Sequence, residues 1–223
     1  MSALWIVTGA SRGIGRAIAE ALAGQGRTLL LTATHARNLQ PVVQALASRG
    51  GAIETCTLEL TRTEALGPLE QAIAGREVAG LVNNAGILEQ GELAALTDAQ
   101  IDRALAVNVS GLMKVTRLAL RTMKPGARIL NVGSISGTLG TPGASLYNAT
   151  KWAVTGLTRS WAEELRPRGI FVGEVRPGSV DTDMLRQTRF PAQMQPGDVA
   201  SVIRFLALQA PMAMTGSAVD CFG

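Results

Sequence analysis

The chain has 223 residues, a length that suits one doubly wound domain and is short for two. Hydrophobic residues make up 47% of it and charged residues 17%, a balance that excludes a disordered chain and allows a large buried core. The formal net charge is +4, but the basic residues are scattered, so they do not indicate a nucleic-acid-binding surface. No uninterrupted apolar stretch is long enough to span a bilayer.

The few cysteine and histidine residues exclude several classes of functional site. Cys56 and Cys221 are far apart and have no metal-ligand partner at a useful spacing, so reduced thiols are expected. His35 is the single histidine, which excludes a histidine zinc site and a hydrolase triad. The N-terminus lacks a signal-peptide pattern. We therefore expect a cytoplasmic protein with no metal site and with neither membrane nor nucleic acid as a partner.

Short apolar runs alternate with helical patterns along the whole chain, without a repeat or a linker. The predicted strands are residues 4–7, 29–32, 53–58, 78–82, 128–132, 171–175 and 218–221. The predicted helices are residues 16–23, 38–48, 63–74, 147–166 and 198–208, with a long helix from a capping box at Thr97 towards Met123. With right-handed crossovers, this alternation predicts an α/β fold: a Rossmann-like doubly wound parallel sheet of about seven strands with helices on both faces, in one domain over residues 1–223.

A glycine-rich turn lies between the first predicted strand and the first predicted helix, in the run Thr8-Gly9-Ala10-Ser11-Arg12-Gly13-Ile14-Gly15. This order of strand, glycine turn and helix brings a pyrophosphate onto the amides of a helix N-terminus. Gly9 would permit the tight turn, Gly13 the close approach of the backbone and Gly15 the packing of helix on strand. A tight turn without any ligand could use the same glycines, so the motif needs support from elsewhere in the chain.

Tyr147 and Lys151 supply that support, because residues four apart lie on one face of a helix. An ammonium group favours a neighbouring phenolate, so Lys151 is expected to pull the pKa of Tyr147 down from about 10. The phenol could then donate and accept a proton near neutral pH. Ligands of doubly wound sheets bind beyond the carboxyl ends of the strands, where Gly9, Asn83, Ser134 and Pro177 each follow or end a predicted strand. These motifs are therefore expected to share one cleft.

Together these residues resemble the short-chain dehydrogenase/reductase family over nearly the whole chain. The glycine turn has that family's Thr-Gly-x-x-x-Gly-x-Gly spacing, and the further matches follow in the family's order: Asn83-Asn84-Ala85-Gly86, Asn108, Ser134, Tyr147, Lys151, Pro177-Gly178 and Thr182. The resemblance implies an oxidoreductase that transfers hydride between a nicotinamide cofactor and a carbonyl or secondary alcohol.

The family resemblance implies a catalytic tetrad of Asn108, Ser134, Tyr147 and Lys151. Tyr147 would give a proton to the carbonyl oxygen or remove it in oxidation, and Ser134 would hold that oxygen and stabilise its charge. Lys151 would lower the pKa of Tyr147 and bind the nicotinamide ribose, while Asn108 would anchor a water that relays protons to Lys151. The implied cofactor-binding residues are Gly9, Ser11, Arg12, Gly13, Ile14, Gly15, Thr34, Glu59, Leu60, Asn83, Ala85, Gly86, Tyr147, Lys151, Pro177, Gly178, Val180 and Thr182.

Cofactor choice depends on the end of the second predicted strand. NAD-specific sites place an acidic residue there, and this chain has Ala33 instead. Arg12 and Thr34 would meet a 2′-phosphate, with charge-assisted hydrogen bonds from Arg12. The segment 32–34 is also similar to that of the 3-oxoacyl-(acyl-carrier-protein) reductases, which use NADPH. We expect NADP(H) in preference to NAD(H). Glu59 stands where many relatives carry an aspartate that meets adenine, and its longer side chain leaves that contact open.

The sequence does not identify the substrate. Residues 181–196 would form an apolar lid whose Arg186 and Arg189 either meet an anionic group or are solvated. An acidic acyl carrier suits the basic balance of the chain, but other ketones, sugars or an alcohol oxidised in reverse also fit.

Two other functional classes stay open as well. A family member that has lost activity could serve as an NADP(H)-binding sensor or scaffold subunit, although all four tetrad positions are filled here. A purely structural interaction protein would not bind a dinucleotide. The family resemblance also implies a homotetramer or homodimer formed through the two long helices, where Trp152 and Trp161 would serve either the interface or the core.

Overall fold

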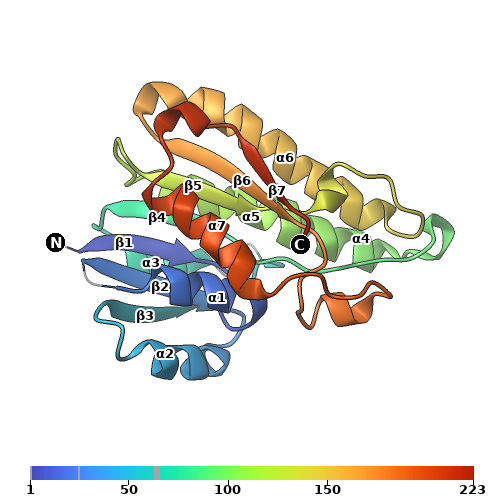
Figure 1. Ribbon diagram of the computed structural model, residues 1–223, viewed down its shortest axis with the longest axis horizontal. Coiled ribbons are helices and arrows are strands. Elements are labelled where there is room, and N and C mark those ends of the chain that lie inside the picture. Colours follow the sequence, from blue (N-terminus) through green and yellow to red (C-terminus); the bar gives the residue numbers. More distant parts are fainter. Residues whose placement is uncertain (1, 25, 63–65) are drawn as a thin grey trace.

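The computed structural model describes residues 2–24, 26–62 and 66–223, and its centre is a parallel sheet of seven strands in the order β3-β2-β1-β4-β5-β6-β7 (Figure 1). The strands are β1 (Ala3–Val7), β2 (Arg27–Ala33), β3 (Ala52–Thr57), β4 (Val78–Asn83), β5 (Arg128–Val132), β6 (Phe171–Pro177) and β7 (Ala218–Cys221). Every neighbouring pair is parallel, and the strand order reverses between β1 and β4. The predicted doubly wound α/β fold is confirmed.

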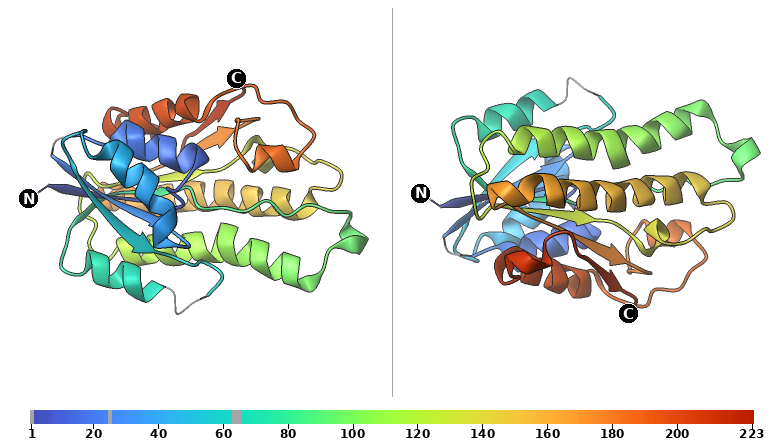
Figure 2. Two further views of the ribbon diagram at one scale, coloured as in Figure 1. Left: turned by 90° about the horizontal axis from the view of Figure 1, so that it is seen from below. Right: turned by 90° about the horizontal axis from the view of Figure 1, so that it is seen from above.

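Helices cover both faces of this sheet (Figure 2). They are α1 (Gly13–Leu22), α2 (Gln40–Leu46), α3 (Gly67–Ile73), α4 (Asp98–Leu105), α5 (Leu112–Ala119), α6 (Ser145–Leu165) and α7 (Pro196–Leu208). Short 3-10 turns occupy Ala36–Leu39, Leu93–Ala95, Ile135–Gly137, Arg166–Arg168, Leu185–Gln187 and Met212–Met214, and a π-helix occupies Ala106–Gly111. One apolar core lies under α1, α2 and α7, and a second lies under α3, α5 and α6. Among the described residues, no helix is both long and apolar enough to cross a membrane.

Several predicted element bounds are corrected by the structure. Helix α1 begins at Gly13 rather than at Arg16, because the glycine turn leads directly into its first turn. The helix predicted over residues 38–48 is a 3-10 turn followed by the short α2. The first three residues of the helix predicted over 63–74 lie outside the described residues, and α3 begins at Gly67.

The long helix predicted from Thr97 to Met123 is interrupted. Its capping box is present, with Thr97 accepting from the Gln100 main-chain N–H and Gln100 accepting from that of Thr97. However, α4 passes into the π-helix Ala106–Gly111 before α5 begins, and α5 ends at Ala119. The extra residue of a π turn rotates the side chains that follow it, and such turns are frequent at functional sites.

A row of polar side chains crosses the α6 face of the sheet where apolar residues would be expected. Asn83 on β4 stands opposite Asn131 on β5, which stands opposite Glu174 on β6. The Asn83 amide donates to Asn131 Oδ1 (2.9 Å) and to Thr116 Oγ1 (2.9 Å), while the Asn131 amide donates to the hydroxyl of Thr158 (2.8 Å). This row lies at or within three residues of the carboxyl ends of β4, β5 and β6, where the predicted site begins.

Candidate active site

The glycine turn after β1 is held by the loop after β4. Thr8 Oγ1 accepts from the main-chain N–H groups of Asn84 and Ala85 (3.0 Å each) and donates to Val82 O (3.3 Å). The Asn84 amide donates to the carbonyl oxygens of Thr8 (2.9 Å) and Gly9 (3.1 Å). These bonds fix the turn at the switch point of the sheet, where ligands of doubly wound folds bind.

All three glycines are required by geometry. Gly9 has φ 64°, in the left-handed region. A side chain at Gly15 would place Cβ 2.2 Å from Gly9 O and 2.4 Å from the Asn84 amide nitrogen, so the helix can approach the turn only with glycine there. Gly13 also has a positive φ, 53°, and its missing side chain faces Thr182 in the loop after β6. The turn therefore presents bare main chain at the start of α1.

Ser134, Tyr147 and Lys151 meet beyond the carboxyl end of β5. Ser134 begins the 3-10 turn Ile135–Gly137, and its hydroxyl accepts from Ser136 N (3.1 Å). The Ser134 hydroxyl is also near enough to the Tyr147 side chain to lower the pKa of that phenol. Lys151 is buried, donates to Val132 O (3.0 Å), and has its Nζ 5.6 Å from the centre of the Tyr147 ring. Three of the four expected catalytic side chains thus form one cluster.

Asn108, the fourth, lies in the π-helix and binds the loop after β4. Its amide oxygen accepts from Ile87 N (2.8 Å), and its amide nitrogen donates to Ile87 O (2.9 Å) and to Thr150 Oγ1 (3.1 Å). Thr150 precedes Lys151 on α6 and donates to Tyr147 O (2.8 Å). Both amide hydrogens of Asn108 are therefore used within the protein.

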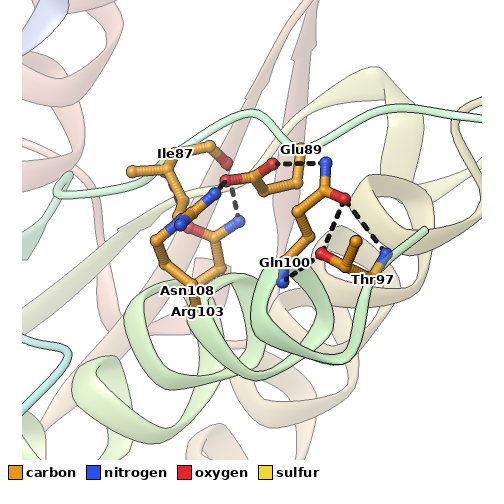
Figure 3. A network of polar contacts seen from close by, with 6 residues as sticks. All are labelled: Ile87, Glu89, Thr97, Gln100, Arg103 and Asn108. Atoms are coloured by element: carbon orange, nitrogen blue, oxygen red, sulfur yellow. Dashed lines mark hydrogen bonds and ion pairs between the residues drawn. The ribbon is translucent and has the colours of Figure 1, made fainter.

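The same loop is anchored a second time on α4, as Figure 3 shows. Glu89 accepts from the guanidinium of Arg103 (2.8 Å) and from the side-chain amide of Gln100 (3.3 Å). Gln100 belongs to the capping box that begins α4. The π-helix and α4 together therefore anchor residues 87–89 of the loop after β4.

Burial controls the proton affinities of the cluster. Although part of the Tyr147 side chain is exposed, desolvation raises its pKa to about 12, and the hydrogen bond with Ser134 opposes this shift. Desolvation lowers the pKa of Lys151 to about 8, and the charge of Glu174 opposes that shift. The net shift of the Tyr147 pKa is therefore upwards, opposite to the expected depression, because desolvation of the phenol is its largest cause.

The predicted cofactor-binding residues fall into two groups. Those of the glycine turn, with Gly86, Pro177, Gly178 and Thr182, lie at the carboxyl ends of the strands. Others are engaged elsewhere: Asn83 in the polar row, Val180 in the apolar core, Leu60 partly against the second core, and Glu59, whose carboxylate accepts from Thr61 N (3.2 Å) and Thr61 Oγ1 (2.9 Å). The carboxylate of Glu59 is thus occupied by its own turn.

Arg12 extends from the glycine turn and donates to Asp183 in the loop after β6 (3.1 Å). Both side chains are more than half exposed, and exposed ion pairs of this kind contribute little to stability. Thr34 is exposed at the end of β2. An open cavity of about 540 Å³ lies between the glycine turn, the first two turns of α1 and residues 181–186.

The segment 181–196 is more polar at its base than the expected apolar lid. Arg186 pairs with Asp181 (3.2 Å) and Asp183 (2.8 Å), and because its side chain is 66% exposed these are solvated surface ion pairs. Met194 is buried and pairs with Val180, whereas Phe190 is exposed. Phe190 and Arg189 line a second open cavity of about 480 Å³, together with residues 90–92 and 141–144.

One buried charge was missed by sequence reasoning. Glu174 lies in β6 and is only 1% exposed, below the loop that carries Ser134. An acidic residue inside the otherwise apolar run 171–175 was the available signal. Among the described residues, no group of three or more His, Cys, Asp or Glu side chains is placed to hold a metal ion.

Comparison with known proteins places this arrangement in context. The model of the short chain dehydrogenase family matches residues 4–192. The chain is 35% identical to the 3-oxoacyl-[acyl-carrier-protein] reductase of Vibrio cholerae, over 98% of this chain and 95% of that protein. It superposes on a short chain dehydrogenase from Burkholderia cenocepacia in complex with NADP (TM-score 0.89, 34% identity, 98% and 96% of the two chains). It also superposes on the 3-oxoacyl-[acyl-carrier protein] reductase from Brucella melitensis in complex with NAD (TM-score 0.89, 26% identity, 99% and 95%).

Tyr147 is the single tyrosine of the chain, so its ionisation can be followed directly by ultraviolet absorbance of the phenolate. Because its pKa in the folded protein lies above the usual value of about 10, we expect a midpoint close to 12, whereas the protein unfolded in urea should titrate near 10. Ser134→Ala should move the folded midpoint higher still, because the hydrogen bond that favours the phenolate is lost. A midpoint at or below 10, at a pH where circular dichroism shows a folded protein, would contradict this assignment.

Proposed function

Since the chain belongs to the short-chain dehydrogenase family and is an NAD(P)-dependent oxidoreductase of carbonyl or alcohol groups, we propose that it is an NADPH-dependent reductase whose catalytic residues are Asn108, Ser134, Tyr147 and Lys151. The observation that carries this proposal is the cluster beyond β5, in which the buried Lys151 ammonium lies 5.6 Å from the centre of the Tyr147 ring and the Ser134 hydroxyl is near enough to influence the phenol. A phenol held next to a hydroxyl and a buried cation is suited to giving a proton to a substrate oxygen.

The residues at the switch point fit a dinucleotide. Gly9 and Gly13 leave the main chain of the turn bare, and Arg12 at the N-cap of α1 makes no side-chain hydrogen bond to the first turn of the helix. The first amides of α1 are therefore available to a pyrophosphate, which a helix N-terminus favours. When bound, the nicotinamide supplies the hydride that adds to the carbonyl carbon.

Residues of the chain itself would supply the proton for the substrate oxygen. The raised pKa keeps Tyr147 protonated at neutral pH, which is the form required of a proton donor to the carbonyl oxygen in reduction. The Ser134 hydroxyl would hold that oxygen, and the Lys151 ammonium would offset the charge left on the phenolate. Asn108 would position the loop at Ile87 and the start of the Tyr147 and Lys151 turn of α6.

We test this role with Tyr147→Phe, measured as NADPH oxidation against acetoacetyl thioesters, quinones and small ketones. General acid catalysis contributes about 10²- to 10⁴-fold, so kcat should fall by roughly that factor while NADPH still binds. Fluorescence of bound NADPH, compared between the variant and the parent, reports the binding. Saturable binding by the parent protein without turnover of any substrate would instead favour the alternative function, an NADP(H)-binding sensor or scaffold subunit.

The preference for NADPH is supported by the residues near the adenosine end of the site. No acidic residue ends β2, where NAD-specific sites need one, and Thr34 is exposed there. Arg12 belongs to the glycine turn and could release Asp183 in order to bind a 2′-phosphate. Because the ion pair with Asp183 is exposed, breaking it would cost little stability. The relatives leave both cofactors open, since one is in complex with NADP and another with NAD.

Arg12→Ala should therefore raise the KM for NADPH about tenfold or more and change the KM for NADH little, because charge-assisted hydrogen bonds contribute about 1.5–3 kcal/mol. Arg16→Ala is the matched control, since Arg16 lines the same cavity but pairs with Glu20 on its own helix. Steady-state kinetics with both cofactors decide the question. Equal efficiency of the parent protein with NADH would contradict the preference.

The substrate class that we favour is a 3-oxoacyl thioester. It is supported by 35% identity to a 3-oxoacyl-[acyl-carrier-protein] reductase over 95% of that protein, and by the net charge of +4, which suits an acidic carrier. The cavity lined by Arg189 and Phe190 lies beside the loop that leads into α6, where it could take the acyl part. The substrate panel above tests this choice directly.

We also propose a homotetramer or homodimer. Leu105 and Met113, on α4 and α5, and Trp152 on α6 are exposed apolar side chains on the helices expected to pair. Trp161, by contrast, packs against the second core, so it serves the fold rather than an interface.

Light scattering should give two or four times the chain mass of 23.3 kDa. Trp152→Glu should lower the mass, because the substitution puts a charge into the apolar contact. Phe190→Glu, an equally exposed aromatic residue in the segment 181–196, is the control and should leave the mass unchanged. A parent protein of monomer mass would contradict the proposal.

A further inference from the structure

Only two charged residues are buried within the described parts of the chain, and they have opposite charge. Lys151 is 7% exposed and Glu174 is 1% exposed. Lys151 belongs to the catalytic cluster, whereas Glu174 has no part in the proton transfer derived above. A buried carboxylate costs several kcal/mol unless it is compensated, so its presence inside a strand requires an explanation.

The carboxylate of Glu174 lies directly behind the cluster. Glu174 Oε1 accepts from Thr155 Oγ1 (3.0 Å), and Thr155 follows Lys151 by one turn of α6. A Cβ at Gly133 would lie 2.0 Å from Glu174 Oε1, which shows that the carboxylate fills the space below the loop that carries Ser134. Gly137, at the other end of that loop, packs against the Lys151 carbonyl and the Thr155 hydroxyl. The carboxylate is thus enclosed by the Ser134 loop and the Lys151 turn of α6.

Lys151 is one of the cations that compensate this charge. The groups that interact electrostatically with Glu174 are Arg176 on its own strand and Lys151 and Arg159 on α6. Arg176 already binds Asp220 on β7 through two hydrogen bonds (2.6 and 3.2 Å), and Arg159 is exposed. Glu174 Oε2 is buried and has no hydrogen-bond partner within the described residues. Of the two cations that act most on this carboxylate, Arg176 is already paired with Asp220, whereas Lys151 is the buried one that shares a turn of α6 with Thr155.

We propose that Glu174 is a positioning residue for the reaction, whose buried negative charge keeps Lys151 in its ammonium form behind Tyr147. This inference rests on the proposed function, because it assigns to Lys151 the role of offsetting the phenolate. Because Glu174 is buried below the cluster, its effect on the reaction is exerted through Lys151. A neutral residue at position 174 would leave the ammonium without its counter-charge.

The proton affinities agree with this arrangement. Burial lowers the pKa of Lys151 to about 8, close to neutral pH, and the charge of the Glu174 carboxylate raises that pKa. Burial raises the pKa of Glu174, while the Thr155 hydrogen bond and the charges of Arg176, Lys151 and Arg159 lower it. Without the carboxylate, the pKa of Lys151 falls further, and the ammonium form is lost at a lower pH.

Glu174→Gln tests the proposal, because glutamine keeps the shape and can still accept from Thr155. We expect the alkaline limb of kcat/KM for NADPH-dependent reduction to move down by about one pH unit, which is a tenfold change in an ionisation constant. Activity should fall about tenfold on that limb and change little at acidic pH. Glu174→Asp, which restores the charge, should move the limb back towards that of the parent.

Thr158→Val is the matched structural control. Thr158 is buried on the same face of α6, and its hydroxyl binds Asn131 in the polar row rather than Glu174. The variant should lower the melting temperature as a buried polar deletion does, but leave the position of the alkaline limb unchanged. A Glu174→Gln protein that loses activity by one factor at every pH, as a purely structural residue would, overturns the proposal.

A second readout does not depend on turnover. The chain has three lysines, Lys114, Lys124 and Lys151, so carbon-13 labelling at lysine Cε gives a spectrum in which Lys151→Arg identifies the third signal. The midpoint of Lys151 should be lower in folded Glu174→Gln than in the parent protein, and an unchanged midpoint contradicts the proposal. If the midpoint moves in a protein that reduces no substrate, the coupling of Glu174 to Lys151 stands and the proposed function fails.

Discussion

The hydrogen bond from Lys151 to the Val132 carbonyl is the constraint on which the candidate active site depends. It fixes the first turns of α6 against the carboxyl end of β5 and buries an ammonium group at the same time. The loop after β5 must then pass over the lysine through Gly133 and Gly137, which brings Ser134 to Tyr147. The burial that gives the site its geometry also removes both ionisable groups from water, and desolvation therefore dominates their pKa values.

The polar row on the α6 face of the sheet supplies hydrogen bonds and a counter-charge to the helix that carries this buried ammonium group. An all-apolar interface between α6 and the central strands would offer no counter-charge and no hydrogen bonds to orient the helix. Instead, Thr158 is held by Asn131, and Thr155 is held by Glu174, so the rotation of α6 is fixed by specific partners. Since Tyr147 and Lys151 lie on the same helix, this rotation sets where their side chains point.

The glycine turn and the loop after β4 form the other half of the site through the same kind of mutual restraint. The Asn84 amide lies against the Thr8 and Gly9 carbonyls, at a distance that only a glycine at position 15 permits. Predicting these glycines from the sequence was straightforward, because strand, turn and helix are local and their spacing is specific. The sequence does not identify Asn84 as the residue that holds the turn, because the contacts of Asn84 span some 75 positions of the chain.

By itself, the sequence determined the order and type of the elements, the parallel sheet, and the gathering of Gly9, Ser134 and Tyr147 at one edge, because these follow from local periodicity and from the chirality of crossovers. Only the tertiary structure decided what depends on packing between distant segments. The π-helix at Asn108 arises where its amide binds Ile87, and Glu174 becomes a partner of Lys151 only because β6 lies below α6. The direction of the Tyr147 pKa shift was likewise decided by the structure, because a residue's spacing fixes its neighbours on a helix but not how deeply the fold buries them.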